Sequence, residues 1–391
     1  MTTQPAPAVR ISRRGAERVE SGHLWIFASD VTDRGAASPG QAVRVVDHTG
    51  RTLGTAHYSA ASQICLRLLS RRAESIDRDF YQARIAAAQE YRQRVVCGTD
   101  AYRVVYGEGD LLPALIIDRY GDYLSVQTLD QGMDRDKPLI AAALINLFAP
   151  RGIIERNDVP VRKREDLPLT KGVLTGEAPG VVPFRMNGLV FHADLLGGQK
   201  TGVFLDQREN YLAAARYARG RALDCFTSTG GFALHMAARC ESVEAVDSSE
   251  AALSIARRNC SANGIGNVEF REANVFDLLT SLRAAGRRFG TIVLDPPAFA
   301  KSRDSLEGAA RGYKEINLRA IELLEPGGCL VTCSCSHHMS EAMLLEIVAS
   351  AALDARRTLR VIERRTQARD HPILLTVPET HYLKCLILQA V

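Results

Sequence analysis

The sequence lacks the features of a secreted, a membrane-embedded or a zinc-binding protein. Its most apolar long stretch, residues 138–150, has about half the length of a membrane-spanning helix and contains Asn146. Residues 1–15 have no apolar core of the kind found in secretory signals. The nine cysteines form no CxxC pair, and the closest spacing, Cys333-Ser-Cys335, does not suit a zinc ribbon. We therefore expect a cytoplasmic protein with free thiols, no metal site and no membrane contact.

Lysine is also scarce, and the positive charge is unevenly distributed along the chain. Only seven of the 49 basic residues are Lys, so 42 are Arg. Residues 1–75 carry ten Arg against six acidic residues, whereas the rest of the chain is balanced, so the whole net charge of +4 lies in this segment. Such a local excess favours a partner with a phosphate backbone, although a solvated surface in an arginine-rich protein would give the same pattern.

The hydrophobic pattern of the 391 residues predicts three domains. In residues 1–75, two stretches at 41–47 and 62–68 alternate apolar and polar side chains and predict a small β-barrel. Residues 76–185 alternate helix and strand patterns typical of a small α+β domain. Residues 186–391 repeat strand and helix, which predicts an α/β domain with a mostly parallel sheet covered on both faces. The polar stretch 162–168 predicts a loop.

A loop between a strand and a helix, residues 223–232, contains Gly230-Gly231. Adjacent glycines let the backbone approach a ligand at a helix N-terminus, although they also occur in ordinary tight turns. The loop does not match the GxGxxG fingerprint of dinucleotide sites. Asp247 ends the next strand, where a carboxylate accepts hydrogen bonds from ribose hydroxyls, and Asn274 follows the strand after that. This order of residues resembles the class I S-adenosylmethionine methyltransferases.

Two further strand ends carry residues suited to catalysis. The segment Leu294-Asp-Pro-Pro-Ala-Phe299 contains two prolines that restrict its shape, so that Asp295 faces the edge of a flat base and Phe299 offers a stacking surface. A simple strand terminator would explain the prolines equally. On the next strand, Cys333 fits a buried core residue, whereas Cys335 lies beyond the strand in a position that suits a thiolate.

A thiolate next to an acid fits one reaction in particular. A thiolate that adds to carbon 6 of cytosine makes carbon 5 nucleophilic toward a methyl sulfonium. An acid hydrogen-bonded at N3, a role for Asp295, stabilises the charge that develops. A base must then remove the carbon 5 proton so that the thiol can leave, and a stacked nucleotide must first be flipped out.

Segments spread over nearly the whole chain resemble the bacterial family of large-subunit ribosomal RNA cytosine-5 methyltransferases with an N-terminal PUA domain. The most specific of them is Lys200–Arg208. The others are His23–Phe27, Tyr58–Gln63, Gly109–Pro113, Asn157–Lys163, Cys225–Phe232, Asp295–Phe299 and Cys333–Ser336. The resemblance implies a PUA-like RNA-binding barrel (1–75), a central α+β domain (76–185) and a Rossmann-like class I methyltransferase domain (186–391).

The same resemblance implies S-adenosylmethionine as cofactor, 23S ribosomal RNA as partner and Cys335 as the nucleophile. The chemistry of the reaction adds Asp295 as the second catalytic residue. The residues that it implies around the cofactor are Asp206, Gln207, Thr227, Gly230 and Asp247. We further expect cofactor contacts from Thr201, Ser248, Asn274 and Asp295, and substrate contacts from Phe299, Lys301, Arg162 and Lys163. Asn274 stands where the family often has Asp. The Asp-Pro-Pro loop has no second Cys, so the base that removes the carbon 5 proton is unidentified.

Three other functions fit parts of the pattern. Asp-Pro-Pro followed by an aromatic residue resembles the motif of enzymes that methylate exocyclic amines, adenine N6 or guanine N2, without a thiol. A non-catalytic RNA-binding ribosome-assembly factor could keep the same scaffold, but it would have no need for Gly230, Asp247 and Cys335 together. A small-molecule methyltransferase would not need a basic N-terminal barrel. The sequence leaves open the target nucleotide and the oligomeric state, a homodimer included.

Overall fold

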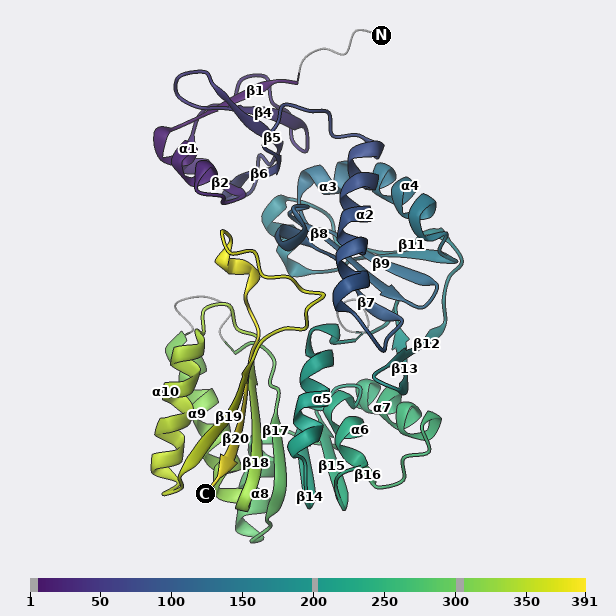
Figure 1. The fold of residues 1–391 in the computed structure, drawn as a ribbon, viewed down its shortest axis with the longest axis vertical. Coiled ribbons are helices and arrows are strands. Elements are labelled where there is room, and N and C mark those ends of the chain that lie inside the picture. Colours follow the sequence, from purple (N-terminus) through teal and green to yellow (C-terminus); the bar gives the residue numbers. More distant parts are fainter. Residues whose placement is uncertain (1–5, 199–202, 300–305) are drawn as a thin grey trace. The chain divides into compact units, whose positions relative to one another are not determined.

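The computed structural model describes residues 6–198, 203–299 and 306–391, and the chain divides into two compact units. The first unit comprises Met1–Phe184, Ala193–Val203 and Arg369–Thr380, and the second comprises Arg185–His192, Phe204–Ala368 and His381–Val391. The first unit therefore includes a short segment from near the C-terminus (yellow in Figure 1). Within the described residues, no helix combines the length and the apolar character needed to cross a membrane.

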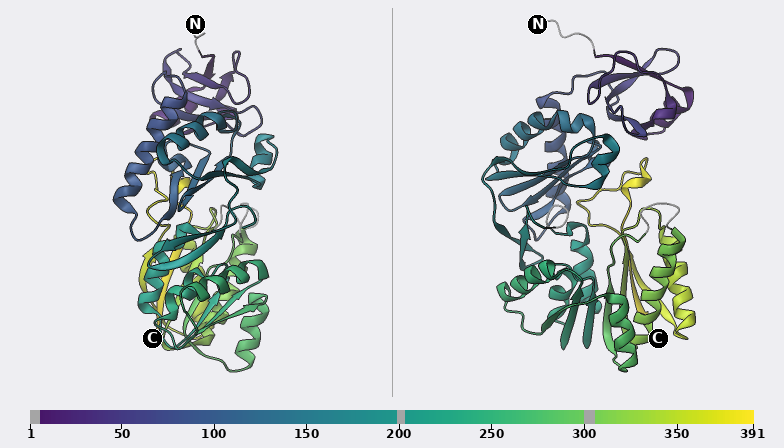
Figure 2. Two further views of the ribbon diagram at one scale, coloured as in Figure 1. Left: turned by 90° about the vertical axis from the view of Figure 1, so that its right-hand side faces the viewer. Right: turned by 180° about the vertical axis from the view of Figure 1, so that it is seen from behind.

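The first unit begins with a six-stranded sheet in the order β2-β6-β5-β4-β1-β3, whose strands curve around a common centre in Figure 2. The strands are β1 (Ala8–Ile11), β2 (Trp25–Phe27), β3 (Val31–Asp33), β4 (Ala42–Val46), β5 (Thr52–Tyr58) and β6 (Ile64–Ser70). Inward side chains such as Val9, Ile26, Val43 and Leu66 are fully buried. The helix α1 (Arg13–Glu20) starts after Ser12, whose side chain accepts a hydrogen bond from the Gly15 amide. The predicted β structure of this segment is confirmed.

The middle of the first unit is a five-stranded sheet in the order β11-β10-β9-β8-β7. Its strands are β7 (Ala101–Tyr106), β8 (Leu115–Tyr120), β9 (Tyr123–Thr128), β10 (Gly152–Asn157) and β11 (Thr170–Gly176). The helices α2 (Arg78–Val95) and α4 (Lys137–Phe148) pack against each other, and α3 (Gln131–Arg135) precedes α4. Their apolar side chains join those of the sheet in one buried cluster. The predicted α+β pattern is confirmed here.

A hairpin of β12 (Val181–Met186) and β13 (Leu189–Asp194) follows. Its two-residue turn is Asn187-Gly188, and both residues have positive φ angles, 56° and 85°. Asn-Gly is the sequence that such a turn favours, because both residues tolerate the left-handed conformation.

The second unit contains a seven-stranded sheet in the order β16-β15-β14-β17-β18-β20-β19. Its strands are β14 (Arg221–Cys225), β15 (Ser242–Asp247), β16 (Val268–Glu272), β17 (Phe289–Leu294), β18 (Leu324–Ser334), β19 (Leu359–Arg365) and β20 (Lys384–Ala390). The first five pair in parallel, whereas β20 runs antiparallel between β18 and β19. The predicted, mostly parallel α/β sheet is confirmed.

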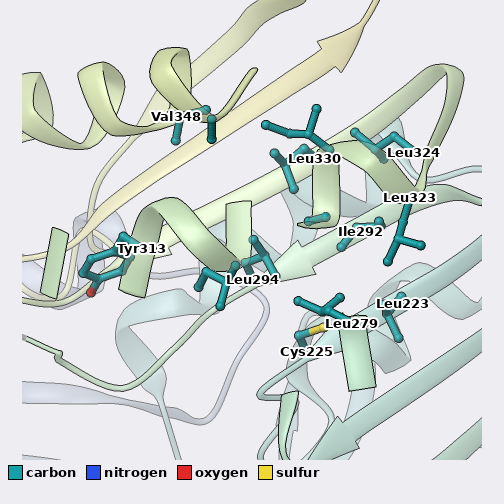
Figure 3. Close-up of a cluster of buried hydrophobic side chains, with 14 of the residues drawn as sticks. Leu223, Cys225, Leu279, Ile292, Leu294, Tyr313, Leu323, Leu324, Leu330 and Val348 are labelled. Carbon is teal, nitrogen blue, oxygen red and sulfur yellow. The ribbon is translucent and has the colours of Figure 1, made fainter. Parts of the chain in front are cut away.

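Helices cover both faces of this sheet (Figure 1). One group consists of α5 (Arg208–Tyr217), α6 (Gly231–Ala237) and α7 (Glu250–Ala262), and the other of α8 (Val275–Ala284), α9 (Leu306–Leu323) and α10 (Glu341–Asp354). Figure 3 shows part of the core under the second group, where Leu279 and Tyr313 from α8 and α9 pack against strand residues such as Ile292 and Leu330. Each fully buried leucine contributes roughly 2 kcal/mol to folding, so the packing of these helices stabilises the sheet.

The order of the strands reverses between β14 and β17, because the chain winds outward from β14 to β16 and then returns to β17. Ligands of open parallel sheets bind beyond the carboxyl ends of the strands at such a reversal. The residues that follow β14, β15, β17 and β18 are therefore the place to look for a functional site.

Candidate active site at the carboxyl ends of the parallel strands

The loop after β14, residues 226–231, has an unusual backbone conformation. Phe226, Ser228 and Gly230 all have positive φ angles, 64°, 51° and 86°. A non-glycine residue in this region costs of the order of 1 kcal/mol or more and persists only where surrounding contacts enforce it. Here the Thr227 amide donates to the carbonyl oxygen of Val246, and the Gly230 amide donates to that of Thr227, both at 2.9 Å. The loop is thus held in a strained shape beside β15.

The two glycines of this loop are required by its packing. A Cβ atom at Gly231 would lie 2.3 Å from the ring of Tyr211, and one at Gly230 would lie 2.6 Å from Leu234 Cδ1. Sequence reasoning assigned both glycines to close approach of a ligand. The structure shows that the lack of a Cβ atom at both positions lets α6 begin directly after the loop and pack against α5.

Two carboxylates support the loop. Asp224 is fully buried, and its Oδ2 accepts hydrogen bonds from Thr227 Oγ1 at 2.6 Å and from the Ala233 amide at 2.9 Å. Burial raises the pKa of Asp224 to about 7, although these hydrogen bonds oppose the shift. Its Oδ1 has no hydrogen-bond partner within the described part of the chain. Such a buried acceptor fits a cationic or hydrogen-bond-donating ligand.

Asp247, the last residue of β15, is the second carboxylate. Its two oxygens accept hydrogen bonds from the backbone amides of Ser228, at 2.8 Å, and Ser249, at 3.0 Å. The carboxylate is partly exposed and lies directly beside the strained loop, with lone pairs left for a ligand hydroxyl. Ser248, next to it, is exposed. This arrangement suits a ribose.

Asn274 is exposed and caps α8, since its Oδ1 accepts a hydrogen bond from the Phe276 amide at 2.9 Å. The capping bond occupies the acceptor oxygen, so the side-chain NH2 group remains for a ligand. Thr201 and Lys301, both predicted to contact ligands, lie outside the described residues.

A chain of hydrogen bonds orients Asp295 at the end of β17. Arg365 Nε donates to Asn210 Oδ1 at 2.9 Å, and Asn210 Nδ2 donates to Gln207 Oε1 at 2.7 Å. Because these bonds fix the Gln207 amide, its Nε2 donates to Asp295 Oδ1 at 3.0 Å. The side chains of Gln207 and Asn210 are buried. Asp295 is thus held as a hydrogen-bond acceptor by residues from α5 and β19.

Asp206, next to Gln207, is also buried. Tyr382 donates its hydroxyl hydrogen to Asp206 Oδ2, and the Ala368 amide donates to the Asp206 backbone carbonyl at 2.8 Å. These contacts join the start of α5 to the segment before β20. The predicted cofactor residues Asp206 and Gln207 therefore belong to the same corner of the sheet as Asp295.

Phe299 closes the Asp-Pro-Pro segment with a half-buried ring. The ring packs against Tyr313, with centroids 4.8 Å apart, and against Phe276, at 6.1 Å. Its position is therefore set by α8 and α9, which gives this end of the sheet an aromatic surface suited to a flat base.

Two cysteines, Cys333 near the end of β18 and Cys335 just beyond it, differ sharply in environment. Cys333 is fully buried, and burial beside Cys385, its partner in the β18–β20 register, raises its pKa well above the ordinary value. The prediction that Cys333 is a core residue is confirmed. Cys335 is half-buried, and its Sγ lies 4.0 Å from the Pro296 carbonyl oxygen. The structure thus brings Cys335 to the Asp-Pro-Pro segment.

The backbone on both sides of Cys335 is fixed by α9. The Tyr313 hydroxyl forms hydrogen bonds with Ser334 Oγ at 2.9 Å and with Ser336 Oγ at 3.2 Å. Figure 3 shows the ring of Tyr313 within the hydrophobic cluster, with its hydroxyl at the edge. The thiol is therefore carried on a rigid support, which sequence reasoning did not identify.

Arg162, predicted to contact the substrate, is fully buried in the first unit. Its guanidinium donates to Pro168 O at 2.9 Å, to Thr128 O and to the Asp134 carboxylate at 2.9 Å. The predicted polar loop forms a 3-10 helix, Pro160–Glu165, around this ion pair. Arg162 is therefore a structural residue, contrary to the prediction, whereas the neighbouring Lys163 is exposed.

Comparison with known proteins agrees with this geometry. Residues 9–71 match a family described as a PUA-like domain, and residues 161–388 match one described as an S-adenosylmethionine-dependent methyltransferase. The ribosomal RNA large subunit methyltransferase I of Klebsiella pneumoniae is 41% identical over 393 aligned positions, which cover 98% of each chain. The chain belongs to this family. The protein of the same name from Erwinia tasmaniensis is 42% identical and covers 93% of this chain, which covers 94% of that protein.

Solved structures with low sequence identity share the fold. A proposed S-adenosylmethionine-dependent methyltransferase from Streptococcus mutans superimposes with a TM-score of 0.83 at 19% identity, and the match covers 98% of this chain and 100% of that one. A crystal structure of a proposed methyltransferase complexed with S-adenosylhomocysteine has a TM-score of 0.84, with the same identity and coverage. The cofactor of the family is S-adenosylmethionine.

The residues present fit this cofactor. The partly exposed Asp247 carboxylate suits the ribose. Asp224 Oδ1, which has no hydrogen-bond partner among the residues that the structure describes, offers an acceptor beneath the strained loop. Asp206, Gln207 and Asp295 add buried or partly buried polar groups at the neighbouring strand ends. The cofactor supplies a methyl group bound to a positively charged sulfur, and the chain must therefore provide the nucleophile or activate one.

Proposed function

We propose that this protein transfers the methyl group of S-adenosylmethionine to carbon 5 of a cytosine in bacterial 23S ribosomal RNA, through a covalent bond between Cys335 and carbon 6. The observation that carries the proposal is the placement of a half-buried thiol 4.0 Å from the Asp-Pro-Pro segment, on a rigid strand end. Methylation of an exocyclic amine needs no thiol at this point.

The chain's own residues have defined roles in this reaction. The Cys335 thiolate adds to carbon 6, and the electron pair of the carbon 5–carbon 6 double bond moves to carbon 5. Carbon 5 then bonds to the methyl group as the bond between that group and the cofactor's sulfur breaks, with its electron pair left on the sulfur. Asp295 acts as the acid at N3: its Oδ1 accepts the hydrogen bond from Gln207 at 3.0 Å, and its protonated oxygen donates to N3 and stabilises the negative charge that develops there. Phe299 supports the flipped base by stacking. Removal of the carbon 5 proton then restores the double bond and expels the Cys335 thiolate.

The identity of the product tests the proposal directly. Unmodified large-subunit ribosomal RNA, protein-free and within ribosomal subunits, is incubated with the full-length protein and deuterated S-adenosylmethionine, then digested for nucleoside mass spectrometry. We expect labelled 5-methylcytidine. Labelled N6-methyladenosine or N2-methylguanosine would instead support the amine reaction of the Asp-Pro-Pro segment, and unlabelled RNA would support a non-catalytic role.

The RNA-binding part of the proposal relies on exposed arginines of the first sheet. Ala8 of β1 lies opposite Arg44 of β4, so Arg10, two residues further along β1, projects from the same face as Arg44. Arg34 directly follows β3, the other neighbour of β1. Arg10, Arg34 and Arg44 are exposed and form no ion pair with a carboxylate in the described ranges. We call these three exposed residues the arginine group and propose that it binds phosphates.

Replacement of all three by Gln is expected to weaken RNA binding and to lower its salt dependence. Each phosphate contact that is lost reduces the slope of log affinity against log salt concentration by about one. Filter binding between low and moderate salt measures this slope. The affinity for S-adenosylmethionine should not change.

The matched control replaces three arginines whose charge is already compensated by an acid. Arg13 pairs with Glu17, Arg51 with Glu20 and Asp47, and Arg72 with Glu74. Their triple Gln variant has the same formal charge as the first variant but should bind RNA more tightly. Equal slopes for the two variants would show that net charge alone, rather than the arginine group, governs binding.

A further inference from the structure

Lys384 occupies an unusual position for a lysine. It is the first residue of β20 and lies opposite Ser334 of β18 in the antiparallel register. Its side chain is almost completely buried, with 3% of its surface exposed. The ammonium group donates one hydrogen bond to the Ser336 carbonyl oxygen and one to that of Tyr382, both at 2.7 Å. Lys384 is thus bonded to the residue that directly follows Cys335.

The charge of Lys384 lacks a carboxylate partner within the described residues. Two carbonyl groups satisfy two of its three N–H donors, but they carry no formal charge to balance the ammonium. A buried charge is costly unless an opposite charge compensates it, and a lysine is seldom retained in such a position without one. The group that acts on it electrostatically is Cys335, which favours its charged form. Burial lowers the pKa of Lys384 to about 8, so most molecules carry the ammonium at neutral pH.

We propose that Lys384 is a positioning residue for the nucleophile, and that its ammonium is the counter-ion of the Cys335 thiolate. The bond to the Ser336 carbonyl holds the ammonium beside the strand end that carries the thiol. A cation in this position favours the thiolate over the thiol, which is the form that attacks carbon 6. The ammonium also stabilises the thiolate that leaves carbon 6 at the end of the reaction, because the same negative charge reappears on sulfur.

The other titratable groups around this strand end do not supply the positive charge. Asp295 is a carboxylic acid and carries no positive charge in either protonation state. Tyr313, on α9, has a pKa raised chiefly by burial and stays neutral, and burial likewise keeps the Cys333 thiol neutral. Tyr382 donates its hydroxyl hydrogen to the Asp206 carboxylate. His337 is exposed and its ring lies 5.6 Å from that of Tyr382, so solvent screens any charge on it.

The inference rests on the proposed role of Cys335 and deepens it, but it makes a separate measurement possible. Alkylation of Cys335 by iodoacetamide depends on the thiolate fraction and requires neither RNA nor cofactor. The full-length protein is alkylated for short times between pH 5 and pH 10, and the modified Cys335 peptide is quantified by mass spectrometry. The exposed Cys97 in the same sample serves as an internal reference for reagent and pH.

In the unmodified protein, the half-maximal rate at Cys335 is expected at a pH below that of an ordinary free thiol, about 8.5. The Lys384→Met variant, similar in volume but uncharged, should move this midpoint upward and lower the rate at pH 7 by about tenfold or more, whereas Lys384→Arg should keep the low midpoint. An unchanged midpoint in a folded Lys384→Met protein would overturn the counter-ion role. If that variant does not fold, an ordinary midpoint in the unmodified protein would overturn it as well.

These outcomes separate the inference from the function. A low midpoint that depends on Lys384, together with a product other than 5-methylcytidine, would contradict the proposed reaction and leave the counter-ion intact. Formation of 5-methylcytidine by a protein with an ordinary midpoint at Cys335 would contradict the counter-ion and leave the reaction intact. A merely structural lysine would change the melting temperature and the amount of folded protein, but not the pH midpoint of alkylation.

Discussion

The Cys335→Ala variant is expected to lose methyl transfer by about 10⁴-fold or more, because carbon 5 of cytosine has no other means of becoming nucleophilic. The loss should appear in the chemical step, measured as single-turnover transfer of labelled methyl groups to large-subunit ribosomal RNA. S-adenosylmethionine binding should change little, since the groups that fit the cofactor lie mainly on the loops after β14 and β15.

The matched control is Cys97→Ala, which removes an exposed thiol from a loop of the first unit. It should retain full activity, so that loss of a cysteine as such cannot explain the result. Activity of Cys335→Ala within tenfold of the unmodified protein would exclude a covalent mechanism and favour methylation of an amine.

The Asp295→Asn variant is expected to reduce the rate of transfer by 10²–10³-fold, which is the usual effect of removing one group that stabilises developing charge. The hydrogen bonds from Arg365 to Asn210 and from Asn210 to Gln207 fix the Gln207 amide with its NH2 group toward residue 295. An asparagine there must turn its oxygen toward that donor, so it presents to N3 an NH2 group, which is a far weaker acid than a carboxyl group. Single-turnover kinetics and cofactor titration together separate the chemical step from binding.

Asp277→Asn is a suitable control, because Asp277 lies in the first turn of α8 and carries the same change of charge. Its rate should match that of the unmodified protein. If Asp295→Asn reacted within threefold of the unmodified protein, Asp295 would have no part in stabilising the flipped base, and the Asp-Pro-Pro segment would be a structural feature of the strand end.

The order of elements in the second unit follows largely from the sequence. The strands β14, β15, β17 and β18 were predictable because buried parallel strands read as short apolar runs separated by helical patterns. The partly exposed β16 was predictable from its place in the same alternation of strands and helices. The position of β20 was not, since nothing local tells an apolar run to insert antiparallel between β18 and β19. The hairpin segment Arg369–Thr380, which belongs to the first unit, likewise depends on contacts with residues far away in the chain.

The candidate site was predictable where strand ends alone define it. Asp247, Asp295 and Cys335 come together because the carboxyl ends of parallel strands meet at one edge. Lys384 and Asn210 were missed, because they reach this edge from β20 and α5. Lys384 left a signal nonetheless, as a single charge within the apolar run 383–388.

For Arg162, the sequence predicted a functional contact where the structure shows a buried ion pair. Its neighbours Lys163 and Arg164 are exposed, and three basic residues in succession suggested a solvated phosphate-binding loop. The partner that buries it, Asp134, lies 28 residues earlier in the chain, so the ion pair could not be read from local sequence.

The central claim is a covalent bond from Cys335 to the pyrimidine, and its most direct test is trapping. Ribosomal RNA containing 5-fluorocytosine at the target keeps the adduct intact, since fluorine cannot leave carbon 5 as a proton does. With S-adenosylmethionine present, a complex stable to denaturation should form, and mass spectrometry of the digested complex should locate the nucleotide on the peptide containing Cys335. Attachment to another cysteine would contradict the account. Recovery of unmodified protein after incubation with the fluorinated RNA would also contradict it, provided that the protein methylates the same RNA with ordinary cytosine at carbon 5.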